Sequence, residues 1–329
     1  MVRFSVIIPV YNRPEEMDEL LESLSLQTWS DFEVIVVEDG SQRDCQEVVE
    51  KYHSKLQVYY FRIANSGPGL ARNYGIKKAN EKYFVFFDSD CIIPAHYFQQ
   101  LANNIQTRNI DAFGGPDQAH WSFSPLQKAI NYSMTSILTS GGIRGNERSA
   151  EKFKPRSFNM GFTYEIFKKT GGFSSLRFGE DIDLSLKIMD LGFTTTLLKE
   201  NFVYHKRRIR LIQFFKQLFN SGMARVYLGK IHPGSIKPVH VLPALFVVGL
   251  LFLFFLSLFL DPLVLLVLVA LIIVLFIHSL MTTKNLGIAF LSVITSFIQL
   301  IGYGCGFVYA LVKRLLGKEG YAFEKSFYR

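Results

Sequence analysis

The sequence predicts an α/β domain with a mostly parallel central sheet, followed by C-terminal transmembrane helices. Two observations lead to this prediction. Strand-like and helix-like segments alternate over residues 1–115, which is the pattern of a parallel sheet with right-handed crossovers. From Pro238 to Val312 only Asp261 and Lys284 are charged, and the apolar runs in this region reach the length of about 20 residues that crosses a bilayer.

The alternating part of the chain predicts four strands with a helix after each. β-Branched and aromatic runs indicate the strands, and apolar residues three and four positions apart indicate the helices. The expected strands are Phe4–Val10, Phe32–Val37, Gln57–Arg62 and Tyr83–Phe87. The expected helices begin at Pro14, after Ser41, within Gly67–Ala79 and at Pro94. The loops Tyr11–Arg13, Glu38–Ser41 and Asp88–Asp90 follow strands, so we expect them to converge at the carboxyl edge of the sheet.

Two carboxylates one residue apart follow the fourth strand. Side chains of an extended strand alternate between faces, so we expect Asp88 and Asp90 to share a face and to approach one cation or one ribose. Magnesium takes one or two carboxylates together with phosphate oxygens, which suits such a sparse site. The pair therefore predicts a metal-bound diphosphate, and a hydrogen-bonded turn is the alternative for the tripeptide taken alone.

The apolar region predicts three membrane segments, 239–260, 263–281 and 286–312. A soluble helical bundle would need outer surfaces with almost no charge, which argues against that alternative. Three crossings would place the C-terminal tail, 313–329, outside the cell, whereas its excess of lysine and arginine favours the cytoplasm. The alternative to three crossings is that one of the three segments is re-entrant or lies in the membrane interface.

The basic charge of the chain is concentrated in residues 206–237, ahead of the first membrane segment. This stretch contains eight lysines or arginines and no aspartate or glutamate. The positive-inside bias places it on the cytoplasmic face, and attraction to anionic membrane lipids explains its sign without a nucleic acid partner. Apolar residues at helical spacing predict one or two amphipathic helices in the membrane interface, with an ordinary core-facing helix as the alternative.

The first 237 residues are expected to lie in the cytoplasm. We expect no signal peptide, because Val2–Val10 is short, lacks a small-residue cleavage site and has the pattern of a strand. The three cysteines, Cys45, Cys91 and Cys305, show no metal-ligand spacing and fit a reducing compartment. The sequence thus predicts a multi-pass protein of the cytoplasmic membrane whose soluble part faces the cytoplasm.

Five motifs in a fixed order resemble those of family 2 glycosyltransferases. They are Val6–Arg13 (VIIPVYNR), Val36–Ser41 (VVEDGS), Ala71–Gly75 (ARNYG), Phe87–Asp90 (FDSD) and Gly179–Asp183 (GEDID). Glu38 departs from the family pattern, in which an aspartate is more usual at that position. The resemblance covers roughly residues 4–205 and implies a GT-A (nucleotide-diphospho-sugar transferase) fold, a nucleotide-sugar donor, a divalent cation and inversion at the anomeric carbon.

The resemblance also implies a set of donor-binding residues. These are Pro9, Val10, Tyr11, Asn12, Glu15, Asp39, Arg72 and Asp88. The four residues from Pro9 would line the base and ribose pocket, and Asp39 would accept a hydrogen bond from the nucleobase. Glu15 would reach the ribose or only favour the N-terminus of its helix. Arg72 would face the diphosphate or the base, with a surface salt bridge as the alternative.

A divalent cation, Mg²⁺ or Mn²⁺, is implied at the aspartate motif. In the family pattern Asp90 ligates the metal directly, and Asp88 contacts the ribose or a metal-bound water. His205 follows a strand-like run and is a candidate third metal ligand or phosphate contact. A membrane-proximal cluster of histidine, lysine and arginine without any ligand is the alternative for His205.

The last motif implies the catalytic base. A base must remove the proton of the attacking hydroxyl on the face opposite the departing diphosphate. The resemblance points to Asp181 for this role, with Glu180 contacting the acceptor or orienting the helix. Asn159 and Gly161 lie in a segment that resembles the one approaching donor sugar and acceptor, where a glycine permits close contact. Residues 116–156 are expected to form an acceptor loop or a plain surface excursion.

The expected protein is a membrane-anchored inverting glycosyltransferase. It would move a sugar from a UDP- or GDP-sugar to a lipid-linked glycan acceptor in surface polysaccharide or exopolysaccharide synthesis. The expected parts are a GT-A catalytic domain (1–205), basic interface helices (206–237), a transmembrane region (238–312) and a basic tail (313–329). Transfer to polyprenyl phosphate itself is the alternative reaction, and a non-catalytic membrane nucleotide-sugar sensor or scaffold is the alternative class.

Overall fold

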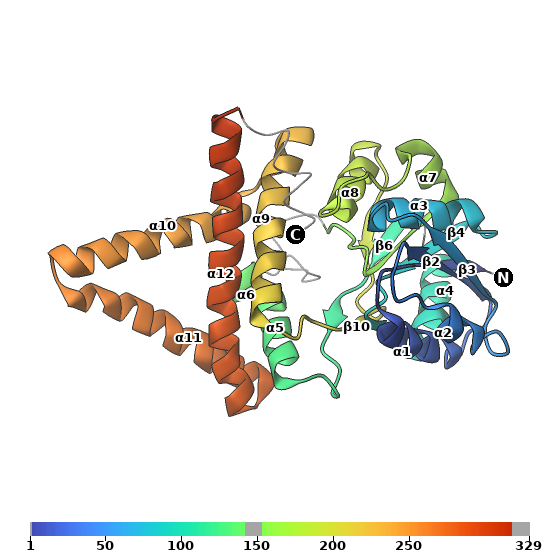
Figure 1. The fold of residues 1–329 in the computed structure, drawn as a ribbon, viewed down its shortest axis with the longest axis horizontal. Coiled ribbons are helices and arrows are strands. Elements are labelled where there is room, and N and C mark those ends of the chain that lie inside the picture. The colour runs from blue at the N-terminus through green and yellow to red at the C-terminus, as the bar shows by residue number, and fades with distance from the viewer. Residues whose placement is uncertain (1, 109, 142–152, 318–329) are drawn as a thin grey trace. The chain divides into compact units, whose positions relative to one another are not determined.

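The computed structural model describes residues 2–108, 110–141 and 153–317. The chain divides into two compact units, which are described separately (Figure 1). The α/β unit comprises Met1–His120 and Glu151–Lys206, and the helical unit comprises Trp121–Ala150 and Arg207–Arg329. Most of the expected basic tail, from residue 318 on, lies outside the described residues.

Among the described residues, the α/β unit is built on a seven-stranded sheet with strand order β3-β2-β1-β4-β8-β6-β9. The strands are β1 (Phe4–Val10), β2 (Phe32–Asp39), β3 (Val58–Ile63), β4 (Tyr83–Phe87), β6 (Ala112–Gly114), β8 (Asn159–Thr163) and β9 (Thr195–Leu197). Of these seven, β8 runs antiparallel to its neighbours β4 and β6, and the other pairs are parallel. The predicted mostly parallel sheet is confirmed.

Helices cover both faces of this sheet. They are α1 (Pro14–Ser25), α2 (Gln46–Glu50), α3 (Pro68–Lys78), α4 (Tyr97–Thr107), α7 (Tyr164–Thr170) and α8 (Glu180–Asp190). Val6 and Ile8 of β1 pack with α1 and α4 in one core cluster, whereas Ile7 packs with α3, α7 and α8 in another. This alternation follows from the period of two along a strand. The central strands are therefore buried on both faces, which explains their nearly continuous apolar sequences.

A second, three-stranded sheet lies in the same unit, with strand order β5-β10-β7. Its strands are β5 (Cys91–Ile92), β7 (Asp117–Gln118) and β10 (Val203–His205). The pairing places His205 opposite Cys91 and Val203 opposite Asp117. This small sheet therefore brings the end of the α/β unit back to the residues that follow β4.

The second strand is two residues longer than predicted. Glu38 pairs with Val10 and Arg62, and Asp39 pairs with Ile63, so both acids lie within β2 rather than in a loop. The helix expected after Ser41 begins only at Gln46, and the Ser41 hydroxyl donates to Glu38 instead of capping this helix. The hydrogen bond from Ser41 to Glu38 therefore ties the loop after β2 to the end of that strand.

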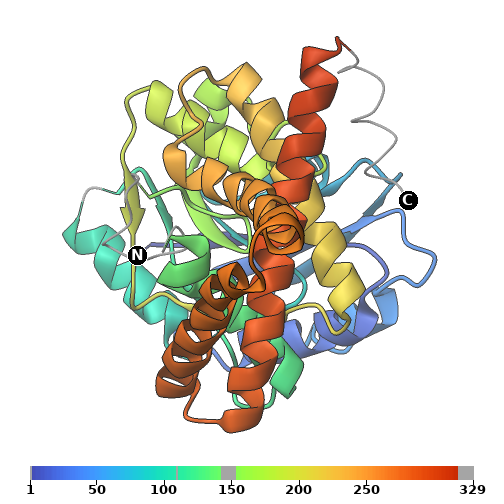
Figure 2. The ribbon, with the colours of Figure 1, turned by 90° about the vertical axis from the view of Figure 1, so that its left-hand side faces the viewer.

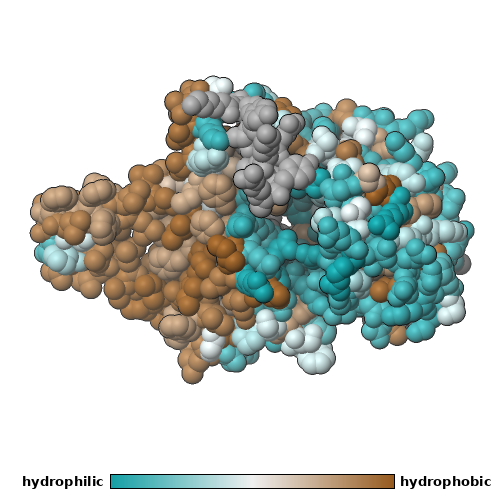
Figure 3. All heavy atoms as spheres, in the orientation of Figure 1, coloured by the Kyte–Doolittle hydropathy of each residue, from teal (hydrophilic) through white to brown (hydrophobic). Residues whose placement is uncertain are grey.

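The helical unit contains the apolar C-terminal region together with two helices from the middle of the chain. Its elements are α5 (Pro125–Thr135), α6 (Ile137–Ser140), α9 (Leu211–Ile231), α10 (Pro238–Phe259), the 3₁₀ turn η1 (Pro262–Leu265), α11 (Leu266–Thr283) and α12 (Leu286–Leu315). Within the described part of the chain, three helical segments are long and apolar enough to cross a membrane: Pro238–Phe259, Pro262–Thr283 and Leu286–Leu315. Their surface is predominantly hydrophobic (Figure 3).

Candidate active site

The residues after β4 form a tight turn. The strand ends at Phe87, and the backbone N–H of Cys91 donates to the backbone oxygen of Asp88 at 3.1 Å. The prediction that Asp88 and Asp90 share one face of an extended strand is therefore wrong. The turn gives the two carboxylates different partners, and the pattern of an extended strand cannot continue where the chain reverses direction.

Arg72 links the aspartate turn to the start of α8. One terminal nitrogen of its guanidinium lies 2.6 Å from Asp88 Oδ1, and the other lies 3.0 Å from Glu180 Oε1. The Arg72 side chain is 2% exposed, and its guanidinium lies 5.3 Å from the ring centre of Phe173. The alternative of a surface salt bridge is wrong. Arg72 instead connects its own motif to the motif that contains Glu180, and the two residues are 108 positions apart in the sequence.

The pKa values of Arg72 and Glu180 reflect one buried guanidinium that lies among several carboxylates. Burial disfavours the charge on Arg72, but Asp88 and Glu180 outweigh it, and the pKa of Arg72 is raised. Burial and the neighbouring Asp181 raise the pKa of Glu180 to about 7, while Arg72 acts in the opposite direction. Glu180 therefore changes its charge close to neutral pH.

Asp181 is the second residue of α8, and its contacts differ from those of Glu180. Its Oδ1 accepts from its neighbour's backbone N–H, that of Ile182, at 2.8 Å, and its Oδ2 accepts from the backbone N–H of Ser157 at 3.4 Å. The guanidinium of Arg156 lies 3.7 Å from Oδ2. The side chain is 14% exposed. Asp181 is thus a partly accessible carboxylate that two backbone donors and a nearby guanidinium hold in place.

Asp90 and His205 meet at the junction of β5 and β10. His205 Nε2 lies 3.0 Å from Asp90 Oδ1, and His205 Nδ1 lies 3.7 Å from Asp117 Oδ2. The other oxygen of Asp90 pairs with the guanidinium of Arg13. The ring of Phe158 stacks on the imidazole at 4.9 Å. The aspartate and histidine named from the sequence as metal ligands are therefore neighbours in space.

The residues around Asp90 fit a divalent cation. Ligand atoms of Asp90, Cys91 and His205 all lie within 4.8 Å of one another. Burial raises the pKa of the Cys91 thiol well above its usual value, and Mn²⁺ and Mg²⁺ prefer oxygen and nitrogen ligands to sulfur. A carboxylate oxygen and an imidazole nitrogen then remain, which is a donor set that Mn²⁺ accepts and that Mg²⁺ uses in part.

The predicted nucleobase residue Asp39 ties three loops together at the carboxyl edge of the sheet. Its carboxylate accepts from the backbone N–H of Ser66 at 2.6 Å and of Gly67 at 2.9 Å. Asn12 has a φ of +55°, and its side-chain oxygen accepts from the backbone N–H groups of Gln42 and Arg43. The predicted convergence of the loops after β1 and β2 is confirmed by the Asn12 contacts, and the Arg13–Asp90 pair brings the loop after β4 to the same edge. The loop before α3 joins them through Asp39, which was not predicted.

The remaining residues assigned to the donor differ in exposure. Pro9 and Val10 are buried within β1, whereas Tyr11 is 50% exposed at its end. Glu15 lies on the exposed first turn of α1, where it pairs with Arg43. A backbone hydrogen bond and this arginine lower the pKa of Glu15. Of these four side chains, Tyr11 and Glu15 are accessible to a ligand.

Asn159 and Gly161 have partners within the α/β unit that explain both residues. Asn159 is fully buried; its side chain accepts from the Tyr97 hydroxyl at 2.6 Å and donates to the Asn201 backbone oxygen at 2.7 Å. A Cβ at Gly161 would lie 2.3 Å from the ring of Phe113. The close contact at Gly161 in this structure is thus with Phe113, and the assignment of this pair to the acceptor stays a prediction.

Two residues of the site were missed by the sequence analysis. Arg13 precedes α1 and pairs with Asp90, and its position directly after Asn12 in the first motif was the available signal. Asp117 faces the second nitrogen of His205. It was not foreseeable because β7 and β10 pair across 86 residues of sequence, from Asp117 to Val203.

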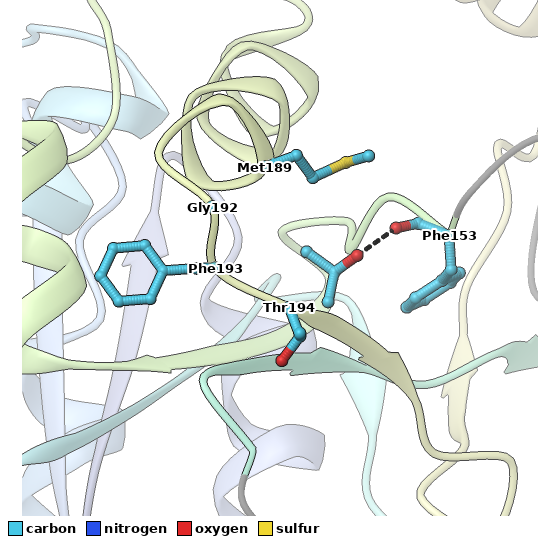
Figure 4. A pocket seen from close by; sticks show the side chains of 6 residues that line it. Phe153, Met189, Gly192, Phe193 and Thr194 are labelled. Carbon is cyan, nitrogen blue, oxygen red and sulfur yellow. Dashed lines mark hydrogen bonds between the residues drawn. The ribbon is translucent and has the colours of Figure 1, made fainter.

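A hollow of about 420 Å³ lies elsewhere in the α/β unit (Figure 4). It is lined by Phe153, Met189, Gly192, Phe193, Thr194 and Thr195. The Thr195 hydroxyl donates to the backbone oxygen of Phe153 at 2.7 Å, as the dashed line in Figure 4 marks. This lining contains no titratable side chain, so the hollow lacks the groups that bind a diphosphate or move a proton.

Comparison with known proteins places this geometry in a family. A parallel sheet with acidic motifs at its carboxyl edge defines the GT-A fold class, and the model of glycosyl transferase family 2 matches residues 5–177, more than half of the 329 residues. The chain belongs to glycosyl transferase family 2. The predicted family and GT-A fold are confirmed.

Individual relatives extend the similarity over different parts of the chain. A glycosyltransferase of Rickettsia bellii (strain RML369-C) is 47% identical over 144 residues, which are 44% of this chain and 20% of that protein. The chain spans a fifth or less of the length of its Rickettsia relatives. The glycosyltransferase EpsJ of Bacillus subtilis (strain 168) is 35% identical over 238 residues, covering 69% of this chain and 68% of EpsJ.

One solved structure is similar over nearly the whole chain. The mannosyltransferase PcManGT from Pyrobaculum calidifontis, in complex with GDP-Man and Mn²⁺, has a TM-score of 0.57 and covers 96% of this chain and 88% of its own. The two sequences are 18% identical. This likeness therefore concerns the fold.

Proposed function

We propose that the chain is an inverting glycosyltransferase that moves a sugar from a UDP- or GDP-sugar to a lipid-linked glycan acceptor. The reaction would take place at the cytoplasmic face of the membrane, in surface polysaccharide or exopolysaccharide synthesis. The observation that carries the proposal is the buried Arg72, which joins Asp88 of the donor motif to Glu180 beside the candidate base. Membership of glycosyl transferase family 2 supports the same reaction class.

Asp90 and His205 are the residues that would hold Mn²⁺ or Mg²⁺. The cation, when bound, supplies Lewis-acid stabilisation of the negative charge that develops on a nucleoside diphosphate leaving group. The 3.0 Å approach of the carboxylate and the imidazole supports this assignment. Asp117 faces the other nitrogen of His205 and would orient the imidazole. PcManGT, whose structure contains GDP-Man and Mn²⁺, supports the pairing of donor and cation.

Asp181 is the residue that we assign as general base. A hydroxyl of the acceptor would transfer its proton to this carboxylate as it attacks the anomeric carbon. Backbone N–H groups of Ser157 and Ile182 hold the carboxylate, and the guanidinium of Arg156 lies 3.7 Å from it. The Arg72–Glu180 pair would position the base by holding the first turn of α8.

The nucleotide would bind at the converging loops. Tyr11 presents an exposed aromatic ring at the end of β1, and aromatic rings stack well on bases. Asp39 would accept from the nucleobase while its backbone hydrogen bonds keep it in place. Asp88, 31% exposed and paired with Arg72, would face the ribose.

The lipid-linked character of the acceptor is inferred from the helical unit. Three of its helices are apolar enough to cross a membrane, and the segment before them carries eight basic residues, from Lys206 to Lys237, without an acidic one. Such a unit keeps an enzyme beside an acceptor that is itself confined to the membrane, which raises the effective concentration of the acceptor.

The direct test is the release of nucleoside diphosphate from a panel of nucleotide sugars. Purified protein would be assayed with native lipid extract, with and without Mn²⁺. We expect release from one donor class, dependent on the cation and on the lipid. Release with polyprenyl phosphate as the sole lipid would favour the alternative reaction. Donor binding without release, in the presence of the full lipid extract, would favour a non-catalytic sensor and contradict the proposal.

A further inference from the structure

The third apolar helix, α12, differs from α10 and α11 in how it is packed. In the most apolar part of each helix, 6% of positions are buried in α10, 11% in the segment that contains α11, and 33% in α12. The buried face of α12 consists largely of small and polar residues, namely Ser292, Thr295, Ser296, Gln299, Gly302, Gly304 and Gly306. This helix therefore turns its polar side inward.

The inward face of α12 contacts helices from the middle of the chain. The Thr295 hydroxyl donates to the backbone oxygen of Ala129 in α5 at 3.1 Å. The side-chain amide of Gln299 donates to the backbone oxygen of Thr139 in α6 at 3.4 Å. These two bonds satisfy polar groups that would otherwise face lipid at a cost of several kcal/mol, on the order of 2–7 for an unpaired group.

The opposite face of α12 is apolar and is exposed toward both ends of the helix, whereas Gly304 near its middle packs against Pro243 of α10. Leu286 is 68% exposed, Phe290 64%, Val312 48% and Leu315 77%. Together with Ile294 and the partly buried Ile301, these residues recur at spacings of three, four, seven or eleven, which places them on one stripe. A helix with one apolar stripe and one polar face is suited to lie in a membrane surface, with the stripe toward the acyl chains.

The basic helix α9 lies alongside the second half of α12. A Cβ at Gly306 would lie 2.0 Å from the backbone oxygen of Phe219, and a Cβ at Gly222 would lie 2.2 Å from that of Tyr303. The same helix exposes Lys216 and Lys230. If α12 crossed the bilayer, α9 would be carried into the hydrocarbon with these charges, at about 2.5–3.5 kcal/mol for each one near the centre. The packing therefore opposes a crossing by α12.

The other two apolar helices form a hairpin that runs away from α12. Figure 1 shows α10 and α11 leaving α12 and meeting at the turn around η1. Figure 2, turned by 90°, shows α10 nearly end-on while α12 runs across the view. Each arm of the hairpin has 22 residues, or about 33 Å of helix, which matches a hydrocarbon core of about 30 Å.

We propose that only the α10–α11 hairpin crosses the membrane, and that α12, with α9 beside it, lies in the plane of the cytoplasmic surface and binds its anionic headgroup layer. The apolar stripe of α12 faces the acyl chains, and the exposed Lys216 and Lys230 of α9 attract anionic lipid. Two crossings return the chain to the cytoplasm, which agrees with Lys313 and Arg314 at the end of α12. This assignment does not depend on the catalytic proposal.

The test measures the depth of α12 in a bilayer. Nitroxide spin labels would be placed singly at Phe290→Cys, Ile301→Cys and Val312→Cys, in a Cys305→Ala background, in vesicles of phosphatidylcholine and phosphatidylglycerol. An in-plane helix gives the same depth at all three positions. Labels at Leu242→Cys, Val248→Cys and Phe255→Cys, exposed positions near the start, middle and end of α10, are the matched control, and they should read shallow, deep and shallow. The same shallow-deep-shallow pattern along α12, or a uniform depth along α10, would overturn the proposal.

A second measurement locates the end of α12 without relying on depth. Leu260→Cys, in the hairpin turn, and Leu316→Cys, after α12, would be treated in spheroplasts with a membrane-impermeant maleimide. We expect labelling of the first variant from outside, and of the second only after permeabilisation. The unsubstituted protein measures the background from its three cysteines. Labelling of Leu316→Cys from outside would show a third crossing and contradict the proposal.

Discussion

At the residue scale, the site depends on a few charged side chains that are held by one another. Arg72 pairs with Asp88 and Glu180, while Asp90 is held between Arg13 and His205. The pairing of Asp90 with His205 was predictable, because the resemblance assigned Asp90 to the metal and the position of His205 after a strand-like run made it a candidate ligand. Arg13 and Asp117 were not predicted, because the first motif gave Arg13 no role and a distant strand pairing brings Asp117 to His205.

Removing the charge of Arg72 is expected to destabilise the α/β unit. Arg72→Gln leaves Glu180 buried without its cation, and breaking a buried ion pair on one side costs about 3–5 kcal/mol in the free energy of unfolding. Urea unfolding followed by tryptophan fluorescence and circular dichroism measures this loss. The double variant Arg72→Gln with Glu180→Gln should recover part of it. Equal losses in the single and double variants would mean that the pair does not couple the two motifs.

Glu180 is expected to make stability depend on pH. Its pKa is about 7 in the folded chain against 4.5 ordinarily, so the folded state favours the protonated form. This contribution is fully present below about pH 4.5 and is lost as the pH rises toward 7. Glu180→Gln should therefore gain stability relative to the unsubstituted protein across this window, measured as the difference in Tm. Glu165→Gln, at an exposed ion pair, is the control, and a flat difference for Glu180→Gln would contradict the assignment.

Arg13 is expected to compete with a cation for Asp90. Arg13→Gln frees one oxygen of this carboxylate, and losing a partly exposed pair worth up to about 1 kcal/mol corresponds to about fivefold in Kd. Mn²⁺ binding without donor should therefore tighten by up to this factor, measured by titration calorimetry. Arg43→Gln, which removes the partner of Glu15 instead, should leave Mn²⁺ binding unchanged. Weaker Mn²⁺ binding in Arg13→Gln would contradict the claim that Arg13 competes with the cation for Asp90.

At the scale of elements, the sequence predicted the first half of the sheet well. The limits of β1 and β4 agree with the prediction, since their apolar aromatic and β-branched runs end abruptly. β2 extends to Asp39 because its last residues pair with β3, which no local pattern reports. The excursion expected at 116–156 contributes α5 and α6 to the helical unit, where bonds from α12 hold them.

A single substitution that adds one methyl group, Gly306→Ala, tests the close packing between α9 and α12. Gly306→Ala would place a Cβ against the backbone of Phe219, and such overpacking costs about 1–3 kcal/mol. Gly249→Ala in α10 is the matched control, because a Cβ there meets nothing within 4 Å and alanine favours a helix. Thermal unfolding in detergent should show a lower Tm for Gly306→Ala alone, and an equal Tm for the two variants would exclude the close contact.

At the scale of the whole molecule, the chain joins a family 2 glycosyltransferase fold to a helical unit in which three described segments are apolar enough to cross a membrane. Composition alone indicated three possible crossings and left open which segment lies in the interface. The packing of α12 against α5, α6 and α9 distinguishes it from α10 and α11, and its lower hydropathy agrees with this distinction. Hydropathy reports how apolar a segment is and not what surrounds it. The family motifs likewise identify a reaction class, whereas donor and acceptor depend on contacts outside those motifs.

The measurement that tests the central claim most directly pairs donor binding with donor turnover in two variants. Asp181→Asn removes the base but leaves the groups at the donor edge, so it should bind the nucleotide sugar with unchanged affinity and lose transfer by about 10²–10⁴-fold. Asp90→Ala should weaken Mn²⁺-dependent donor binding as well as transfer. Undiminished transfer by Asp181→Asn, in protein shown to be folded, would contradict the assignment of this carboxylate as the base and with it the account of the site.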